Sequence, residues 1–427
     1  MTEEKIVPAK NLLGSLQLPG DKSISHRYGM LAALAEGKST FANFSTGADC
    51  QSTLACASAL GAKVTRNNGL VEIEGVGGNF RKPASPLDCG NSGSTMRMMA
   101  GILAGQDFDC ELFGDSSLMR RPMARVQKPL RQFGAQIELK PDGRPPMQIR
   151  GGKLKAIDFA SDVPSAQVKS AVLFAGLQAS GITSYDESIR TRDHSELALR
   201  AFGAEITRTR NRISIEGNQR LLAIDATVPG DISSAAFFFC ASALFPKSNL
   251  VVQGVGLNPT RAALLDVLSS LGAKVSMLNV EEKNGELTGT VKVEHGRLRS
   301  LKIDASMAAL LIDELPVLAA IGPYTEEGIE IRGARELRVK ESDRIAAVAA
   351  GLRAMGAEVQ EYEDGLFVKG NQKLHGATID SFGDHRIAMA FSIAALRAEG
   401  ETIIKDSECA GISFPEFFTL LRQISEV

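Results

Sequence analysis

Basic side chains recur at the expected starts of helices in this sequence, beside small hydroxyl and amide residues. A helix N-terminus has free N–H groups and about half a positive charge, so it repels a Lys or Arg unless an anion lies between them. A single case costs only about 0.3–1 kcal/mol and could be a solvated turn. The cations placed in this way come from both halves of the chain: Lys22, Arg27, Arg97, Arg121, Lys169, Arg192, Lys340, Arg344 and Arg386. This recurrence predicts a site that binds small ligands with several negative charges.

The segment from residue 18 to residue 27 is the first of these motifs. Its Pro19-Gly20 turn ends an extended stretch, and a helix is expected to follow. Ser23 and Arg27 then lie one turn apart on the same face of that helix. Its apolar stripe is expected to contain Ile24, Tyr28, Leu31 and Ala35.

A loop rich in small residues precedes a second expected helix. In the segment 90–95, Gly-Asn-Ser-Gly-Ser-Thr, small residues expose backbone N–H groups. Asn91, Ser94 and Thr95 add side-chain donors. The loop therefore suits a phosphate or carboxylate, although taken alone a plain Gly/Ser-rich turn would explain it equally well.

Three more helix starts carry polar groups. Arg121 precedes Pro122, which we expect at the first helical position, and the planar guanidinium can hold two oxygens of one anion. A solvated arginine pair is the alternative. The segment 165–169, Ser-Ala-Gln-Val-Lys, offers hydroxyl, amide and ammonium donors. Near Arg192, we expect Asp193 to cap its helix, a structural role.

Acidic residues stand beside the cations in the second half of the chain. Asp313 and Glu314 interrupt an apolar run from Leu310 to Leu318. A carboxylate in such surroundings needs a partner or a raised pKa, which suits a general base, while an N-cap is the competing explanation. Glu341 and Arg344 are three residues apart on an expected helix and could form a plain surface ion pair.

The overall composition narrows the possible function classes. A net charge of −2 in 427 residues argues against nucleic acid or an anionic membrane as the main partner. The six cysteines contain no Cys-x-x-Cys pair and fit a reduced chain, while five scattered histidines argue against a zinc site. Without a signal peptide or an apolar run of about 18 residues, the chain is expected in the cytoplasm.

An internal repeat of roughly 70 residues runs along the chain. In each copy an expected helix ends at a Gly-Ala pair and a strand follows. The glycines of these pairs are Gly61, Gly134, Gly203, Gly272 and Gly356. Each is expected to take the left-handed conformation that ends a helix. The segment Phe417–Arg422 resembles a sixth helix whose following strand is missing.

A longer repeat is superimposed on the first. Pro19-Gly20-Asp21 recurs as Pro229-Gly230-Asp231, three units of the shorter repeat further on. We therefore predict an α/β protein with two domains of three βα-rich units each: residues 20–230 form the first, and residues 1–19 and 231–427 form the second. The chain would cross between them near residues 20 and 230, forming a hinge, with the ligand site in the cleft.

Five of these motifs, in this order, resemble those of the 5-enolpyruvylshikimate-3-phosphate synthase family. The matching segments are 19–27 (PGDKSISHR), 90–94 (GNSGS), 121–123 (RPM), 338–344 (RVKESDR) and 384–386 (DHR). The resemblance implies two domains, each of three βαβαββ repeats around buried helices. It also implies transfer of the enolpyruvyl group of phosphoenolpyruvate to the 5-hydroxyl of 3-phosphoshikimate, with release of phosphate from a tetrahedral intermediate. The family needs no metal or organic cofactor, and a monomer is expected.

The resemblance also assigns roles to individual residues. The residues that would bind 3-phosphoshikimate are Lys22, Ser23, Arg27, Ser165, Ala166, Gln167, Arg192, Asp313 and Lys340. Those that would bind phosphoenolpyruvate are Lys22, Asn91, Gly93, Arg121, Gln167, Arg344 and Arg386. Asp313 would take the proton of the 5-hydroxyl, and Glu341, helped by Lys22, would protonate the methylene carbon. The reaction requires such an acid and such a base.

One departure and two rival functions bear on this assignment. Ala166 stands where many family members have a second serine, so a hydrogen bond must come from elsewhere, for which Arg192 is a candidate. The related transferase that acts on UDP-N-acetylglucosamine has a Cys in a Gly-rich loop before its Arg-Pro, where this chain has Leu-Met-Arg at 118–120. A non-catalytic phosphosugar-binding protein would gain nothing from Asp313 and Glu341 in a cationic cleft.

Overall fold

The computed structural model of the chain describes residues 2–67 and 69–427. Its contacts divide the chain into two compact units. The middle unit contains residues 20–228 and 283–286. The terminal unit contains the residues up to Pro19 together with 229–282 and 287–427.

Three four-stranded sheets with one common pattern form the framework of the middle unit. In each sheet the first two strands are parallel and the other neighbours are antiparallel. The strand orders are β14-β3-β5-β4, β6-β7-β9-β8 and β10-β11-β13-β12. The strands are β3 (Lys38–Ala42), β4 (Lys63–Asn67), β5 (Leu70–Glu74), β6 (Leu87–Asp88), β7 (Asp109–Phe113), β8 (Gln136–Glu138), β9 (Met147–Arg150), β10 (Asp158–Ser161), β11 (Ile182–Glu187), β12 (Ile206–Thr209), β13 (Arg212–Glu216) and β14 (Asp225–Thr227).

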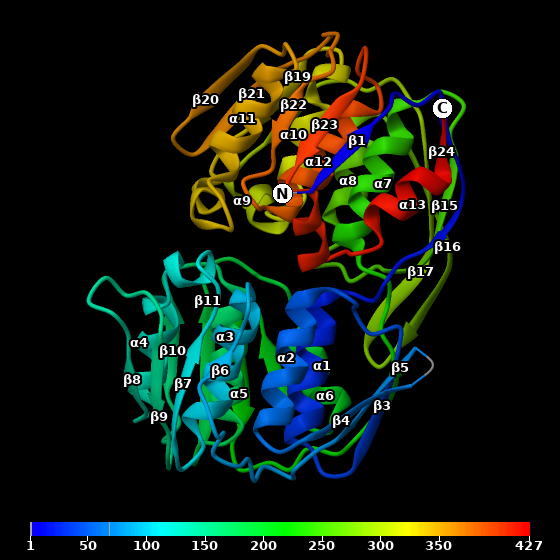
Figure 1. Ribbon diagram of the computed structural model, residues 1–427. Coiled ribbons are helices and arrows are strands. Elements are labelled where there is room, and N and C mark those ends of the chain that lie inside the picture. The colour runs from blue at the N-terminus through cyan, green and yellow to red at the C-terminus, as the bar shows by residue number, and fades with distance from the viewer. Residues whose placement is uncertain (1, 68) are drawn as a thin grey trace. The chain divides into compact units, whose positions relative to one another are not determined.

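Two α-helices accompany each sheet of the middle unit. They are α1 (Lys22–Leu34), α2 (Ala48–Ala59), α3 (Gly93–Ala104), α4 (Ala124–Gln132), α5 (Ala166–Gly176) and α6 (His194–Ala201), with a 3-10 turn η1 (Leu118–Arg120). The helices α1, α3 and α5 are buried on nearly every side beyond their first turns. Figure 1 shows them between the strands of the β3 sheet and those of the β7 sheet. A helix can be buried in this way when small or apolar residues surround it.

The terminal unit follows the same plan with modified edges. Its sheets have the orders β16-β17-β15-β2-β24, β18-β19-β21-β20 and β1-β23-β22. The strands are β1 (Glu3–Ile6), β2 (Asn11–Gln17), β15 (Asn249–Gly256), β16 (Lys274–Lys283), β17 (Glu286–Glu294), β18 (Leu301–Ile303), β19 (Gly328–Ile331), β20 (Val359–Tyr362), β21 (Gly365–Lys369), β22 (Thr378–Asp380), β23 (Thr402–Lys405) and β24 (Ser425–Glu426).

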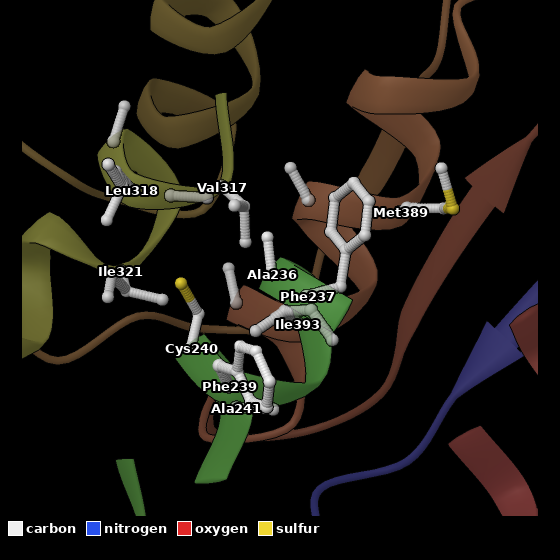
Figure 2. Packing of buried hydrophobic residues seen from close by; sticks show 14 of the residues in the cluster. Ala236, Phe237, Phe239, Cys240, Ala241, Val317, Leu318, Ile321, Met389 and Ile393 are labelled. Carbon is white, nitrogen blue, oxygen red and sulfur yellow. The ribbon is translucent and has the colours of Figure 1, made fainter. Parts of the chain in front are cut away.

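The helices of the terminal unit enclose a core of aromatic and aliphatic side chains. They are α7 (Ile232–Leu244), α8 (Ala263–Leu271), α9 (Ala305–Leu310), α10 (Leu315–Ile321), α11 (Arg344–Ala354), α12 (His385–Ala395) and α13 (Phe417–Ile424), with the 3-10 turns η2 (Gly322–Tyr324), η3 (Arg335–Val339) and η4 (Ser407–Ile412). Figure 2 shows Phe237 of α7 near Val317 of α10 and Met389 of α12. All three are at most 1% exposed, so this packing holds the starts of α7, α10 and α12 in fixed positions.

The glycine repeat is confirmed by the backbone. Gly61, Gly134, Gly203, Gly272 and Gly356 have φ angles of 108°, 106°, 91°, 114° and 90°. These values lie where residues with a Cβ are strained, and each glycine follows the end of a helix. The repeated Gly-Ala pair therefore marks the same structural position five times.

Three local predictions differ from the structure. The first helix has no single apolar stripe, because every residue from Ile24 to Leu34 is buried. Pro122 is not at the first position of a helix, since α4 begins at Ala124. A strand does follow the last helix: the short β24 pairs with β2.

Candidate functional site

The start of α1 brings a predicted cation next to an acid. Asp21 is the N-cap, and its Oδ1 accepts a hydrogen bond from the backbone N–H of Ile24 at 2.9 Å. Lys22 Nζ lies 3.0 Å from Oδ2 of Asp49, which is in the first turn of α2. Sequence reasoning missed Asp49, although an acid in the first turn of a helix is a recognisable signal.

Arg27 is almost completely buried, and its guanidinium joins three helices. Its Nε, Nη1 and Nη2 donate to Ser195 Oγ, Ser23 O and Ser170 Oγ, at 2.7, 2.7 and 2.8 Å. The two serine hydroxyls are themselves 2.6 Å apart. These bonds connect α1 with α5 and α6 and fix the direction of the guanidinium.

A neutral histidine lies beside these cations. Burial, together with the charges of Lys22 and Arg27, lowers the pKa of His26 well below its ordinary value of 6.5. Its Nδ1 is 2.6 Å from Thr53 Oγ1, which is 2.7 Å from Thr95 Oγ1. Thr95 is fully buried in this chain of polar contacts, so the prediction that it offers a donor to a ligand is wrong.

The Gly-rich loop is in contact with Arg121. The Nη2 of Arg121 donates to Asn91 Oδ1 at 2.6 Å, and Asn91 Nδ2 donates to Asp115 Oδ2 at 2.7 Å. Ser92, at the N-cap of α3, accepts from the Thr95 N–H at 3.0 Å. A Cβ added to Gly93 would stand 3.4 Å from Arg121 Nη1 and 2.7 Å from Arg97 Nη1. The loop, Arg97 and Arg121 therefore form one polar surface.

Gln167 links this surface to α5. Its Oε1 accepts from Arg97 Nη1 at 2.7 Å, and its Nε2 donates to Ser94 Oγ at 2.9 Å. Ser165 is the N-cap of α5, and its Oγ accepts from the Val168 N–H at 3.3 Å. Ala166, the first residue of α5, can form a hydrogen bond to a ligand only through its backbone.

Arg192 reaches the same region from the loop before α6. Its Nη1 is 3.5 Å from Ser23 Oγ, although the two residues are 169 positions apart. Asp193 occupies the N-cap position of α6, but its side chain does not cap the helix. Its Oδ2 instead accepts from Arg190 Nη2 at 3.0 Å, so the predicted capping role is wrong.

Lys169 does not belong to the set of cations that can attract a ligand. Its side chain is fully buried, and its Nζ lies 2.9 Å from Glu196 Oε1 and 3.0 Å from Glu187 Oε1. The prediction for Lys169 is therefore wrong, because two buried carboxylates neutralise its charge. The residues of this unit that the resemblance assigned to the substrates form what we call the middle-unit cluster: Lys22, Ser23, Arg27, Asn91, Gly93, Arg121, Ser165, Ala166, Gln167 and Arg192.

Arg344 is the centre of a second group in the terminal unit. Its Nε donates to Asp384 Oδ2 at 2.8 Å and its Nη2 to Glu341 Oε2 at 2.6 Å, while its Nη1 lies 3.7 Å from Asp313 Oδ1. The Arg344 side chain is 2% exposed, so the plain surface ion pair considered for Glu341 and Arg344 is wrong. Burial lowers the pKa of Arg344, but the carboxylates of Asp384 and Glu341 outweigh it and raise this pKa above its ordinary value.

Two more cations belong to this group. Burial lowers the pKa of the half-buried Lys340, and the attraction of Asp313 only partly opposes this. Arg386 follows Asp384, the N-cap of α12, which accepts the Arg386 N–H at 2.9 Å. The Arg386 guanidinium lies 5.9 Å from the Phe237 ring centre. We call these six residues the terminal-unit cluster: Asp313, Lys340, Glu341, Arg344, Asp384 and Arg386.

The two neighbouring acids at 313 and 314 have different surroundings. Glu314 is 1% exposed and accepts a hydrogen bond from the Ser233 hydroxyl, which in turn accepts one from Arg261. Glu314 stands at the N-cap position of α10 without capping it. The Asp313 side chain is 19% exposed beside Arg344, so of the two acids only Asp313 is accessible.

Sequence reasoning missed two buried residues of the terminal unit, Asp384 and Arg261. Asp384 lay within a noted motif but received no role, although its position before an apolar helix is that of an N-cap. Arg261 follows Asn258-Pro259-Thr260 just before α8, which is one more cation at a helix start. The same signal that identified the other cations could have identified it.

Three further findings come from the described residues. All six cysteines are free and buried. Within residues 2–67 and 69–427, no helix combines the length and apolarity that crossing a membrane requires. The same residues contain no group of three or more His, Cys, Asp or Glu side chains arranged to hold a metal ion.

The fold of this chain is that of solved enolpyruvyl transferases. The fold matches the solved enolpyruvyl transferase NikO from Streptomyces tendae with a TM-score of 0.77 and 18% identity, over 98% of this chain and 96% of that one. It matches EPSP synthase from Acinetobacter baumannii with a TM-score of 0.88 and 40% identity, over 99% and 98%. These matches confirm the predicted fold class, an α/β enolpyruvyl transferase fold with three repeats per domain.

Sequence comparison then specifies the family. The model of the family described as EPSP synthase (3-phosphoshikimate 1-carboxyvinyltransferase) matches residues 6–421. The 3-phosphoshikimate 1-carboxyvinyltransferase of Koribacter versatilis is 64% identical over the full length of both chains. That of Solibacter usitatus is 53% identical over 99% of this chain and all of its own. The chain belongs to the EPSP synthase family, as its motifs predicted.

Proposed function

We propose that this transferase moves the enolpyruvyl group of phosphoenolpyruvate to the 5-hydroxyl of 3-phosphoshikimate and releases phosphate, as a step of the shikimate pathway to aromatic amino acids. Membership of the EPSP synthase family over residues 6–421 supports the reaction. The observation that supports the site is the arrangement around Arg344, where a buried cation holds two accessible carboxyl groups, Asp313 and Glu341. A protein that only binds anions would not gain from carboxylates in that position.

The middle-unit cluster supplies most of the proposed substrate contacts. Ser23, Arg27, Ser165, Ala166, Gln167 and Arg192, with Lys340 of the other unit, are proposed for 3-phosphoshikimate. The Gly-rich loop and Arg121 are proposed for the phosphate of phosphoenolpyruvate, and Arg344 and Arg386 for its carboxylate. Arginine suits these positions because its planar fork matches two anionic oxygens. Part of the proposal is that both clusters face one cleft between two domains divided near residues 20 and 230.

Asp313 and Glu341 divide the proton transfers between them. Asp313 takes the proton of the 5-hydroxyl as its oxygen bonds to the central carbon of phosphoenolpyruvate. Glu341, with Lys22, gives a proton to the methylene carbon, which becomes a methyl group. The tetrahedral intermediate then loses phosphate and one methyl proton, which restores the double bond. The surrounding cations stabilise the charge that develops on the phosphate.

The test is phosphate release from phosphoenolpyruvate with 3-phosphoshikimate, in the parent and in Asp313→Asn. We expect kcat to fall by about 10²–10⁴-fold in this variant, because general base catalysis typically contributes that much. Binding of 3-phosphoshikimate should change little. Asp364→Asn is the matched control, since Asp364 pairs with Arg332 outside the cluster. Full activity in Asp313→Asn would remove this residue from the mechanism, and an inactive parent would refute the reaction.

We propose in addition that the protein acts as a monomer in the cytoplasm. Six buried free thiols support a reducing compartment. Light scattering coupled to size exclusion tests the oligomeric state, and a mass other than 45.5 kDa would contradict it.

A further inference from the structure

Four charged side chains lie close together at the end of β11, next to the loop that carries Arg192. Lys169 and Glu187 lie 3.0 Å apart, Lys169 and Glu196 2.9 Å, and Arg208 Nη2 lies 2.6 Å from Glu187 and 2.9 Å from Glu196. Lys169 is fully buried, and both glutamates are 2% exposed. We call these residues the Lys169 cluster.

Stability alone is a poor explanation for such a cluster. Removing paired charges from water costs about as much as their attraction returns, and apolar replacements of similar volume are often neutral or stabilising. The cluster is also neutral overall, since two cations face two carboxylates, so it adds little field for an anionic ligand. The cluster can instead hold the residues that are bonded to it in fixed positions.

The residue held by this cluster is Thr191. The Thr191 backbone N–H donates to Glu187 Oε1 at 3.0 Å, and its hydroxyl donates to the same oxygen. Lys169 Nζ donates to the Thr191 carbonyl at 3.5 Å. Both backbone polar groups of Thr191 and its side chain are therefore bonded to buried, paired charges.

Glu187 remains an acceptor under ordinary conditions. Burial raises the pKa of Glu187, but the charge of Lys169 and the hydrogen bonds from Thr191 and Arg208 outweigh burial and lower it. An ionised carboxylate has no proton to donate, so its contact with the two donors of Thr191 cannot reverse direction.

The next residue along the chain is Arg192, whose Nη1 comes within 3.5 Å of Ser23 Oγ. On the other side of Arg192, the ring of His194 is buried and its Nδ1 lies 2.6 Å from Glu286 Oε1. The short segment between Thr191 and His194 is therefore attached at both ends, and Arg192 extends from its middle.

We infer that Glu187, Lys169 and Thr191 are positioning residues for 3-phosphoshikimate: they fix the peptide before Arg192 and so place its guanidinium beside Ser23. This inference rests on the proposed function, in which Arg192 and Ser23 bind that substrate. Neither Glu187 nor Lys169 touches the substrate. Their contribution is the low conformational freedom of Arg192 before binding.

Thr191→Val and Thr191→Ser make a matched pair for the test. Valine keeps the shape of threonine but has no hydroxyl to donate to Glu187, while serine keeps the hydroxyl. For Thr191→Val we expect KM for 3-phosphoshikimate to rise about 10-fold, which corresponds to about 1.4 kcal/mol. KM for phosphoenolpyruvate and kcat should stay within about 2-fold of the parent, and Thr191→Ser should resemble the parent throughout.

A double-mutant cycle with Arg192→Gln tests whether Thr191 acts through Arg192. We expect Arg192→Gln to raise KM for 3-phosphoshikimate and Thr191→Val to add nothing in that background. Equal values for Thr191→Val and Thr191→Ser, or full additivity with Arg192→Gln, would overturn the inference and leave the proposed function intact. An unchanged KM in Arg192→Gln would refute the substrate contact itself, and the inference with it.

Discussion

Replacement of Asp384 by asparagine tests whether the terminal-unit cluster depends on a buried charge. Asp384 caps α12, with its Oδ1 accepting the Arg386 N–H, and its Oδ2 accepts from Ser342 Oγ at 3.0 Å and from Arg344 Nε at 2.8 Å. Its side chain is 0% exposed. Asparagine caps helices as well as aspartate does, so the capping bond survives. The substitution therefore removes the negative charge next to the buried guanidinium of Arg344.

The size of the effect follows from burial. Breaking a buried ion pair by removing one partner costs about 3–5 kcal/mol, because the other charge stays in a medium of low polarity. Asp343 provides the matched control. It caps α11 and pairs with Arg338 at 2.8 Å, but its side chain is 40% exposed, so Asp343→Asn should cost at most about 1 kcal/mol.

Urea unfolding of the two variants and the parent measures the difference in the free energy of unfolding. For a folding unit of about 200 residues, 1 kcal/mol corresponds to about 2–4 °C in melting temperature, so calorimetry should show a shift of about 6–20 °C for Asp384→Asn. If Asp384→Asn and Asp343→Asn lose equal stability, the carboxylates around Arg344 are not what holds this cluster together.

Three further outcomes are expected. Gly93→Ala should fold, because the contact closer than 3.0 Å that the added Cβ makes is with the end of the flexible Arg97 side chain, at 2.7 Å from Nη1. Displacing this guanidinium should raise KM for phosphoenolpyruvate by about 10-fold in steady-state kinetics. Since burial lowers the pKa of Lys340, affinity for 3-phosphoshikimate should fall with rising pH before 10.5 is reached, and Lys340→Arg should abolish this fall in a pH profile. The same shift affects stability: the free-energy cost of burying the ammonium in the folded state disappears as pH rises through the lowered pKa of Lys340. Phe382 is 53% exposed and has a φ of 54°, a backbone conformation that is strained for an aromatic residue and easier for asparagine. Phe382→Asn should therefore raise the free energy of unfolding by about 1 kcal/mol in urea titrations. A loss of stability would show that the contacts of the aromatic ring stabilise the fold by more than the backbone strain destabilises it.

The fold was predictable to the extent that one local rule repeats. A helix end that needs a positive φ selects glycine, so the Gly-Ala pairs marked five corresponding positions without any knowledge of packing. Which residues are buried, in contrast, could not be predicted from the local sequence. The sequence of α1 has a readable stripe at Ile24 and Tyr28, yet the polar Ser25 and His26 between them are buried as well, because other helices and the strand β5 pack against this helix.

Individual site residues were predictable where the chemistry lay in the side chain and its helix start. Lys22, Arg121 and Arg344 were proposed as site residues in this way. The signal failed for Lys169, because a cation at a helix start attracts a ligand only if no carboxylate from another segment reaches it first. Glu187 and Glu196 belong to β11 and α6, and their distance to Lys169 is a property of tertiary packing.

The charge count of the terminal-unit cluster connects its structure with its proposed chemistry. Lys340, Arg344 and Arg386 bring three positive charges, and Asp313, Glu341 and Asp384 bring three negative ones. A substrate carboxylate placed on Arg344 makes this set net negative, and Coulomb repulsion in a buried site then favours the protonated form of one carboxyl group. Asp384 is held by four hydrogen bonds, including two from Arg344. The proposed role of Glu341 as the acid requires that phosphoenolpyruvate binding itself brings the enzyme into the protonated state that donates to the methylene carbon.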